Sequence, residues 1–314
     1  MAGETLQYSA LFSRKQPGGV YTIADILEHP GKVYFVDSGH ANAVNSVGAG
    51  RRPDKPWATL AYAFSSDVVA AGDVVYVMPG HAENLAAADA IAMDIAGVTV
   101  VGIGKGNRIP TFSATAAAGE IDISAANITI KNIRLTCNFT GGSTAAIAIA
   151  AGGTGCTLEG LQFRDTLNTK EWLIHISVAA AVTDLVVRNC SFIGLTGGSM
   201  TNSILFAGAT TDTLIEDNVF HVDSSDDVID HLAAAAVNHI IRRNVVVNMD
   251  TDAAGYCVRT HASSTGVVHD NRFAYNKVDA EISSGGATWW LRNFASNTIA
   301  ESDLLDPTTA HAIP

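Results

Sequence analysis

Short stretches in which apolar and polar residues alternate recur along the chain. Each combines an alternating run, a polar pair and one further apolar residue, as in "TLIEDNVF" (213–220), "HIIRRNVV" (239–246) and "GVVHDNRF" (266–273). Alternation with a period of two is the pattern of a β-strand that buries one side. The pattern therefore predicts many short strands separated by turns.

These stretches recur at nearly even intervals. Their last apolar residues are separated by 26 to 29 positions and are Leu135, Phe163, Phe192, Phe220, Val246, Phe273 and Ile299. About 27 residues are too few for a propeller blade, and no helix fits between the strands. Parallel strands that stack coil upon coil at roughly 4.8 Å satisfy the spacing. We therefore predict an all-β fold, a right-handed parallel β-helix with coils of about 27 residues.

One polar position of the repeat is held by asparagine in its later copies. Asn218, Asn244, Asn271 and Asn297 occupy it, and Cys190 occupies it one coil earlier. Asparagine tolerates the left-handed backbone of a tight turn, and its amide can bond the neighbouring coil. We interpret this column as a structural ladder. The four cysteines occur singly, without CxxC spacing, which favours buried thiols over a metal site or a disulfide framework.

The segments that flank the repeats predict caps for the solenoid. Residues 1–30 form an N-terminal arm, and 31–80 form a cap in which "KVYFVDSG" is a strand and "PDKPWATL" leads into an amphipathic helix. The helix is expected to place Leu60, Ala63, Phe64 and Val68 on one face. Residues 81–300 form the β-helix, where Trp289 and its neighbour Trp290 could fill the last coil, and 301–314 form a tail.

The entry segment and the Asn-turn repeats, over residues 33–299, resemble right-handed β-helix proteins of the tailed-bacteriophage tailspike-like and capsid-decoration type. The resemblance implies a virion structural protein, a decoration or cement protein, that forms a parallel homotrimer along an apolar outer stripe. The arm 1–30 would bind the major capsid protein or other virion proteins. Such virions assemble in the host cytoplasm, which agrees with the lack of a signal-peptide pattern in "MAGETLQYSALFSRKQPGG".

An alternative is a polysaccharide-degrading enzyme, either a hydrolase or a lyase. Its candidate residues, Asp226, Asp227, Asp230 and His231, lie in "HVDSSDDVIDH" (221–231). Carboxyl groups of this kind act as an acid and base pair or hold calcium. A solvated turn whose side chains bond their own backbone explains the same residues, and we favour that interpretation. Strand alternation places Asp230 inside unless the register shifts by one residue, which we favour because a buried carboxylate needs a partner.

A second alternative is a non-catalytic module that binds a host glycan. Trp172 or Trp289 could stack on a sugar, and His175 and His231 are expected to face outward in a row with Arg259. No cofactor and no metal site are predicted.

Composition narrows the remaining classes of function. The net charge is −12, with 19 basic and 31 acidic residues, which argues against a nucleic-acid partner. Hydrophobic residues make up 47% and charged residues 16% of the chain, so a large core is expected. No apolar run is long enough to predict a membrane-spanning segment.

Overall fold

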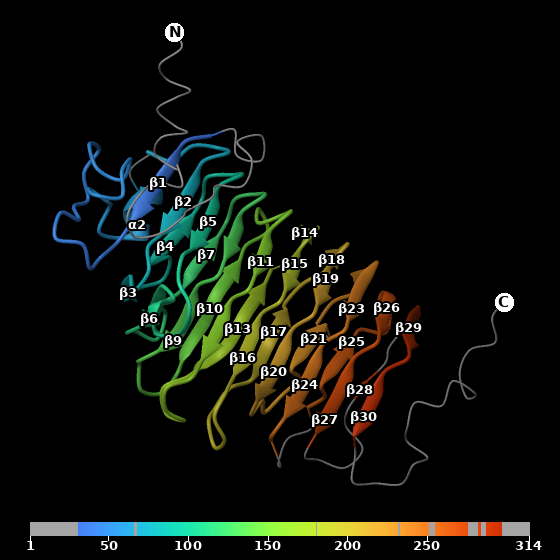
Figure 1. Ribbon diagram of the computed structural model, residues 1–314. Coiled ribbons are helices and arrows are strands. Elements are labelled where there is room, and N and C mark those ends of the chain that lie inside the picture. The colour runs from blue at the N-terminus through green and yellow to red at the C-terminus, as the bar shows by residue number, and fades with distance from the viewer. Residues whose placement is uncertain are drawn as a thin grey trace.

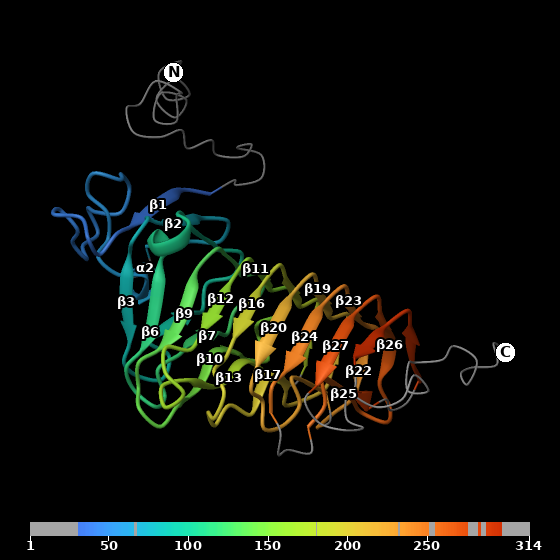
Figure 2. The same ribbon diagram turned by 60° about the horizontal axis from the view of Figure 1, so that its bottom comes forward.

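The computed structural model describes residues 31–65, 68–179, 181–231, 233–250, 255–275, 282–283 and 287–296, which form a right-handed parallel β-helix (Figure 1). The chain visits three sheets in turn, so each coil contributes one strand to each of three faces. Figure 2 shows the coils stacked along one axis, with the only α-helix of the described residues at the N-terminal end. The fold predicted from the repeat is confirmed.

The first face is a ten-stranded sheet. Its strands, in spatial order, are β1 (Val33–Val36), β2 (Val74–Val77), β5 (Thr99–Gly102), β8 (Thr129–Lys131), β11 (Thr157–Glu159), β15 (Val186–Arg188), β19 (Leu214–Glu216), β23 (His239–Arg242), β26 (Thr265–His269) and β29 (Ala287–Leu291).

The second face is a nine-stranded sheet that follows the first face around each coil. It consists of β3 (Ala82–Leu85), β6 (Thr111–Ala114), β9 (Arg134–Cys137), β12 (Gln162–Arg164), β16 (Ser191–Ile193), β20 (Val219–Val222), β24 (Val245–Asn248), β27 (Arg272–Tyr275) and β30 (Phe294–Ser296). A 3-10 turn, η1 (Gly106–Arg108), precedes β6.

The third face is an eight-stranded sheet that completes each coil. Its strands are β4 (Ile91–Met93), β7 (Ile121–Ile123), β10 (Ser143–Ile149), β13 (Trp172–Val178), β17 (Asn202–Phe206), β21 (Ile229–His231), β25 (Val258–Thr260) and β28 (Ile282–Ser283). A small sheet of β14 (Val182–Thr183), β18 (Thr210–Thr211) and β22 (Ala236–Val237) lies before the return to the first face.

Strand pairing stacks equivalent residues of successive coils directly on one another. On the second face this gives a buried aromatic column, in which the Phe163 and Phe192 rings lie 4.6 Å apart and the Phe192 and Phe220 rings 4.4 Å apart. Val246 and Phe273 extend the column by two more coils. Stacked rings bury large apolar area at the centre of each coil, so these columns supply much of the core.

From β8 onward, the corner between the first and second faces is a two-residue turn that repeats at every described coil. Its first residue has a positive φ in each copy, and the series is Asn132, Gly160, Asn189, Asp217, Arg243, Asp270 and Arg292. The left-handed backbone there turns the chain sharply, so the next residue points into the core. That inward residue is Ile133, Leu161 and Cys190 in three coils, and asparagine in the coils that follow.

The predicted cap strand and helix are present at the N-terminal end as β1 and α2 (Leu60–Ser65). The helix buries Leu60, Ala63 and Phe64, as its sequence pattern predicted, but it ends before Val68. Its first amide groups donate to the Glu83 carboxylate, with the Leu60 nitrogen 2.6 Å from Oε2. A negative charge at a helix N-terminus is favourable, so Glu83 fixes the cap to the second face. The predicted arm 1–30 and tail 301–314 lie outside the described residues.

Candidate functional site

The asparagines of the corner form a hydrogen-bonded ladder inside the solenoid. The Asn244 Oδ1 atom accepts bonds from the Asn218 backbone nitrogen and Nδ2, each at 3.0 Å. In the same way, the Asn271 Oδ1 atom accepts bonds from the Asn244 backbone nitrogen and Nδ2. At the other end of the ladder, Asn218 Oδ1 accepts the Cys190 N–H at 2.9 Å. All of these groups are buried, so each amide satisfies backbone groups that water cannot reach.

The next rung of the ladder is Asn293, whose Oδ1 accepts the Asn271 N–H at 3.0 Å. The sequence assigned this position to Asn297, which lies outside the described residues. The last coil is shorter than the others, because Ala295 pairs with Phe273 at the register position expected for Ile299. The stretch "TWWLRNFA" (288–295) matches "HIIRRNVV" when Arg292 is aligned with Arg243, and this alignment would have identified Asn293.

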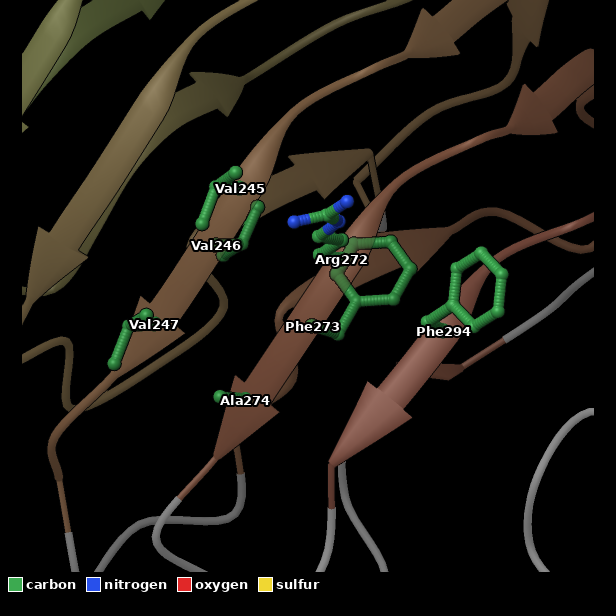
Figure 3. Close-up of a pocket in the computed structure, with 7 residues that line it drawn as sticks. All are labelled: Val245, Val246, Val247, Arg272, Phe273, Ala274 and Phe294. Carbon is green, nitrogen blue, oxygen red and sulfur yellow. The ribbon is translucent and has the colours of Figure 1, made fainter.

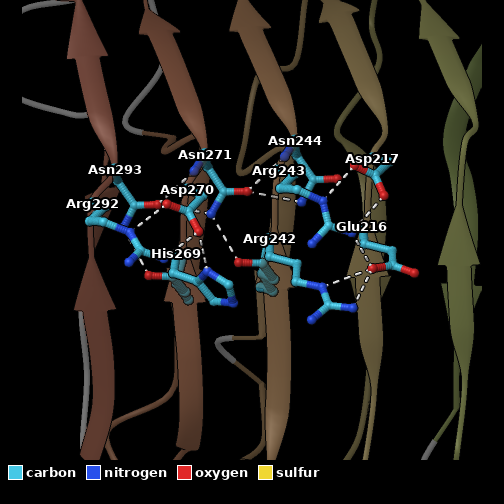
Figure 4. A network of polar contacts seen from close by, with 12 residues as sticks. Glu216, Asp217, Arg242, Arg243, Asn244, His269, Asp270, Asn271, Arg292 and Asn293 are labelled. Atoms are coloured by element: carbon cyan, nitrogen blue, oxygen red, sulfur yellow. Dashed lines mark hydrogen bonds and ion pairs between the residues drawn. The ribbon is translucent and has the colours of Figure 1, made fainter.

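Beside the Asn ladder, oppositely charged side chains alternate along the outside of the corner (Figure 4). Arg243 bonds Asp217 at 2.7 Å and Glu216 at 2.6 Å on the preceding coil. Arg292 makes the same kind of contact with Asp270, at 2.7 Å. Strands that stack in register place equivalent side chains close together, so like charges would repel at every coil. We call this alternating series the charge ladder. Exposed ion pairs contribute little to the free energy of folding, so the main effect of the alternation is to avoid repulsion between like charges on neighbouring coils.

The acidic turn between β20 and β21 separates its candidate residues. Asp226 is exposed, whereas Asp227 is fully buried, and its Oδ1 accepts the Tyr256 N–H at 2.8 Å. Asp230 lies at the register position of Leu205 and Arg259 on the outer side of the third face, but it is only 6% exposed and is therefore buried there as well. The shift by one residue favoured from the sequence is therefore present, because Ile229 rather than Asp230 pairs with the buried Ile204.

Electrostatics set Asp227 apart from the rest of this turn. Burial and, to a smaller extent, the charge of Asp230 raise the pKa of its carboxyl to about 7, against the opposing effects of Tyr256 and Arg259. The Arg259 Nη1 atom lies 3.5 Å from the carboxylate, and its guanidinium stands 5.4 Å above the Tyr256 ring. The geometry gives an acid that holds its proton near neutral pH beside a cation on the third face.

His175 and His231 were expected to face outward with Arg259, and this prediction is wrong. Both imidazoles are fully buried, and the His231 ring lies 3.8 Å from the Phe206 ring. The register shift that turns Asp230 outward turns its neighbour His231 inward, and His175 packs between Phe163 and Phe192. Burial lowers the pKa of His175 to about 3, so both groups are neutral core residues.

The tryptophans considered for sugar stacking differ in their placement. Trp172 is fully buried, so its ring offers no face to a glycan. Trp289 is 40% exposed on the outer side of the first face. Trp290 packs partly buried against the core of the last described coil, as the sequence suggested for the pair, whereas Trp289 faces outward and does not fill the coil.

A row of outward residues on the first face changes character halfway along the solenoid. In register, the row begins with Val33 and Val74 in the cap and then has Thr99, Thr129 and Thr157. It then continues through five successive coils with apolar residues only, namely Val186, Leu214, Ile240, Val267 and Trp289. Within it, Ile240 is 37% exposed. We call the apolar part of this series the first-face row.

On the second face, an outward row likewise changes from polar to mainly apolar residues along the solenoid. Its outward row runs from Thr111, Arg134, Gln162 and Ser191 to Val219, Val245, Arg272 and Phe294. We call the last four positions the second-face row. A hollow of about 230 Å³ lies there, lined by Val245, Val246, Val247, Arg272, Phe273, Ala274 and Phe294 (Figure 3). Phe294 is 63% exposed and stands at its rim.

Sequence reasoning expected an apolar outer stripe but did not locate it. The signal lies in the doubled apolar pairs of the later repeats, as in "LVVRN", "TLIED", "HIIRR" and "TWWLRN", where the earlier repeats have a threonine before the inward residue. In each doubled pair the first residue faces outward and the second faces the core.

In the described part of the chain, no group of three or more His, Cys, Asp or Glu residues is placed to hold a metal ion. The four cysteines are free and buried, and burial raises the pKa of Cys190 to about 12. None of the described helices has the length and apolar character needed to cross a bilayer.

No family model and no curated protein matches this chain. Among solved structures, it is similar to the pectin methylesterase PemA from Erwinia chrysanthemi, with 10% identity, a TM-score of 0.49, and coverage of 86% of this chain and 91% of that chain. It is also similar to a pectin methylesterase from Aspergillus niger, with 12% identity, a TM-score of 0.48, and coverage of 92% of this chain and 94% of that chain. For pectate lyase Pel9A the identity is 12% and the TM-score is 0.47, with coverage of 90% of this chain and 82% of that chain. At these identities and TM-scores, no activity transfers to this chain.

Proposed function

We propose that this protein is a structural β-helix that assembles with two further copies of itself into a parallel homotrimer and serves as a decoration or cement protein of a bacteriophage virion. The observation that carries the proposal is the first-face row, which is apolar through five successive coils. A contiguous apolar surface of this kind marks an interaction site in a protein that folds in water. The virion role rests on the resemblance of the entry segment and repeats to decoration proteins, and the arm 1–30 would contact the capsid.

The size of the particle in solution tests the assembly. Light scattering coupled to gel filtration should give three times the chain mass for the natural protein. The double variant Leu214→Lys and Ile240→Lys should give the monomer mass with an unchanged circular dichroism spectrum, because charges in the first-face row must be desolvated in the interface. The matched variant Thr129→Lys and Thr157→Lys alters the same row outside its apolar part and should remain trimeric. A monomeric natural protein at micromolar concentration would refute the proposal.

Polysaccharide cleavage on the third face is the second candidate function. The observation in its favour is the Asp227 carboxyl, whose pKa is raised to about 7 beside Arg259 and Asp230. A protonated acid close to a second carboxyl group is the arrangement that glycoside hydrolysis uses. Because the Asp227 carboxyl is fully buried, this candidate requires the acidic turn to open before a glycan can reach the acid. The Asp227→Asn variant should then abolish release of oligosaccharides from a host capsular polysaccharide. Asp226→Asn, which alters the exposed neighbour, should leave the release unchanged.

A further inference from the structure

The second-face row raises the question of what covers it. Val219 is 44% exposed, Val245 37% and Phe294 63%, and the hollow beside them is apolar apart from Arg272. The first-face row lies on the other side of the charge ladder, so the two rows border the same corner of the solenoid. If copies of this chain contacted one another through the first-face row alone, the second-face row would remain exposed to water.

Each position of the first-face row has a partner position on the same coil. Leu214 precedes Val219 by five residues, Ile240 precedes Val245 by five, and Trp289 precedes Phe294 by five. The two rows therefore lie at equal heights along the solenoid axis. A partner whose own repeat differs from one coil would lose register with such a row after a few coils, whereas a second copy of this chain keeps register throughout.

The polar positions in the earlier coils of both rows determine whether the neighbouring copy lies parallel or antiparallel to the first. Threonines fill the first-face positions of the three coils from Thr99 to Thr157, and Arg134 and Gln162 fill those of the second face in two of these coils. An antiparallel neighbour would place apolar positions of one copy against polar positions of the other. A parallel neighbour brings apolar positions together on the coils of Leu214, Ile240 and Trp289, and it places Val267 against Arg272 on the coil between the last two.

From these observations we infer that the first-face row of one copy packs on the second-face row of the next copy, in a parallel and heterologous contact that closes into a ring. The inference rests on the proposed trimer and names its interface. A three-fold ring requires two different complementary surfaces on each chain, and the two rows supply them. Arg272 lies at the centre of the second surface, and arginine is a residue type enriched at interfaces.

Chemical cross-linking of co-expressed variants tests this contact. Ile240→Cys and Val245→Cys chains, one of them with a removable tag that changes its mass, are co-purified and treated with a short bis-maleimide. The native cysteines are buried, so the new thiols react selectively. The heterologous contact predicts a tagged–untagged product on a denaturing gel that joins one Ile240→Cys chain to one Val245→Cys chain. Each variant expressed alone should give no dimer band.

The controls separate this inference from the trimer itself. Asp226→Cys, on the exposed acidic turn, should give no product with either variant. Dimer bands from Ile240→Cys alone would show that the first-face rows pack on one another, and would overturn the inference while leaving the trimer in place. Trimeric particles without the mixed product would also overturn it. A monomeric natural protein would remove the proposed function as well.

Discussion

Truncation of Asn244 tests the contribution of the Asn ladder to stability. Its Oδ1 atom accepts two hydrogen bonds from Asn218, and its Nδ2 atom donates to the Ile215 carbonyl and to Asn271 Oδ1, with all four at 3.0 Å. The Asn244→Ala variant removes all four bonds and leaves the buried Asn218 N–H without its acceptor. Asn218 Nδ2 keeps its bond to the Val187 carbonyl, and Asn271 Oδ1 still accepts the backbone N–H of residue 244. Each lost bond costs about 1 kcal/mol, and each unsatisfied group costs somewhat more. The change should therefore lower the free energy of opening of the neighbouring coils by about 3–6 kcal/mol.

Hydrogen exchange is a suitable measurement because solenoids open locally. The backbone amide of Asn218, which donates to Asn244 Oδ1, should exchange faster by about two to four powers of ten. The control is Asn84→Ala, which removes an exposed asparagine from β3 and should leave exchange in the ladder unchanged. A loss below about 1 kcal/mol at Asn218 would refute the claim that the ladder is a main source of cohesion.

Two further predictions follow from buried groups elsewhere. The pKa of His175 is about 3 in the fold, so the unfolded chain takes up a proton first as the pH falls below about 6.5. Stability from the neutral imidazole is complete above that pH and should decline toward pH 4, and guanidinium titrations should show a smaller decline in His175→Leu. A Cβ atom on Gly102 would lie 2.0 Å from the Asn132 carbonyl oxygen, so Gly102→Ala should sharply reduce the melting temperature. Gly48→Ala, at a position with open space, should leave the melting temperature unchanged.

The repeat in the sequence was sufficient to predict the architecture. A column such as Phe163, Phe192 and Phe220 recurs once per coil, and a fold that stacks equal lengths of chain must superpose those residues. The Asn ladder was predictable for the same reason, since Asn218 and Asn244 hold one position in two repeats. Local alternation and equal spacing are properties of the chain itself, and the β-helix converts them directly into neighbours in space.

The tertiary structure decided which side of the third face each residue occupies and which outward rows meet at a corner. Alternation leaves the phase of a strand open by one residue, and only the pairing of Ile229 with Ile204 sends His231 into the core and Asp230 outward. Asp227 is fully buried and accepts the Tyr256 N–H of the next coil, a contact that the local sequence does not contain. Likewise, Ile240 and Val245 belong to different faces, and they border one corner because the turn between them bends the chain.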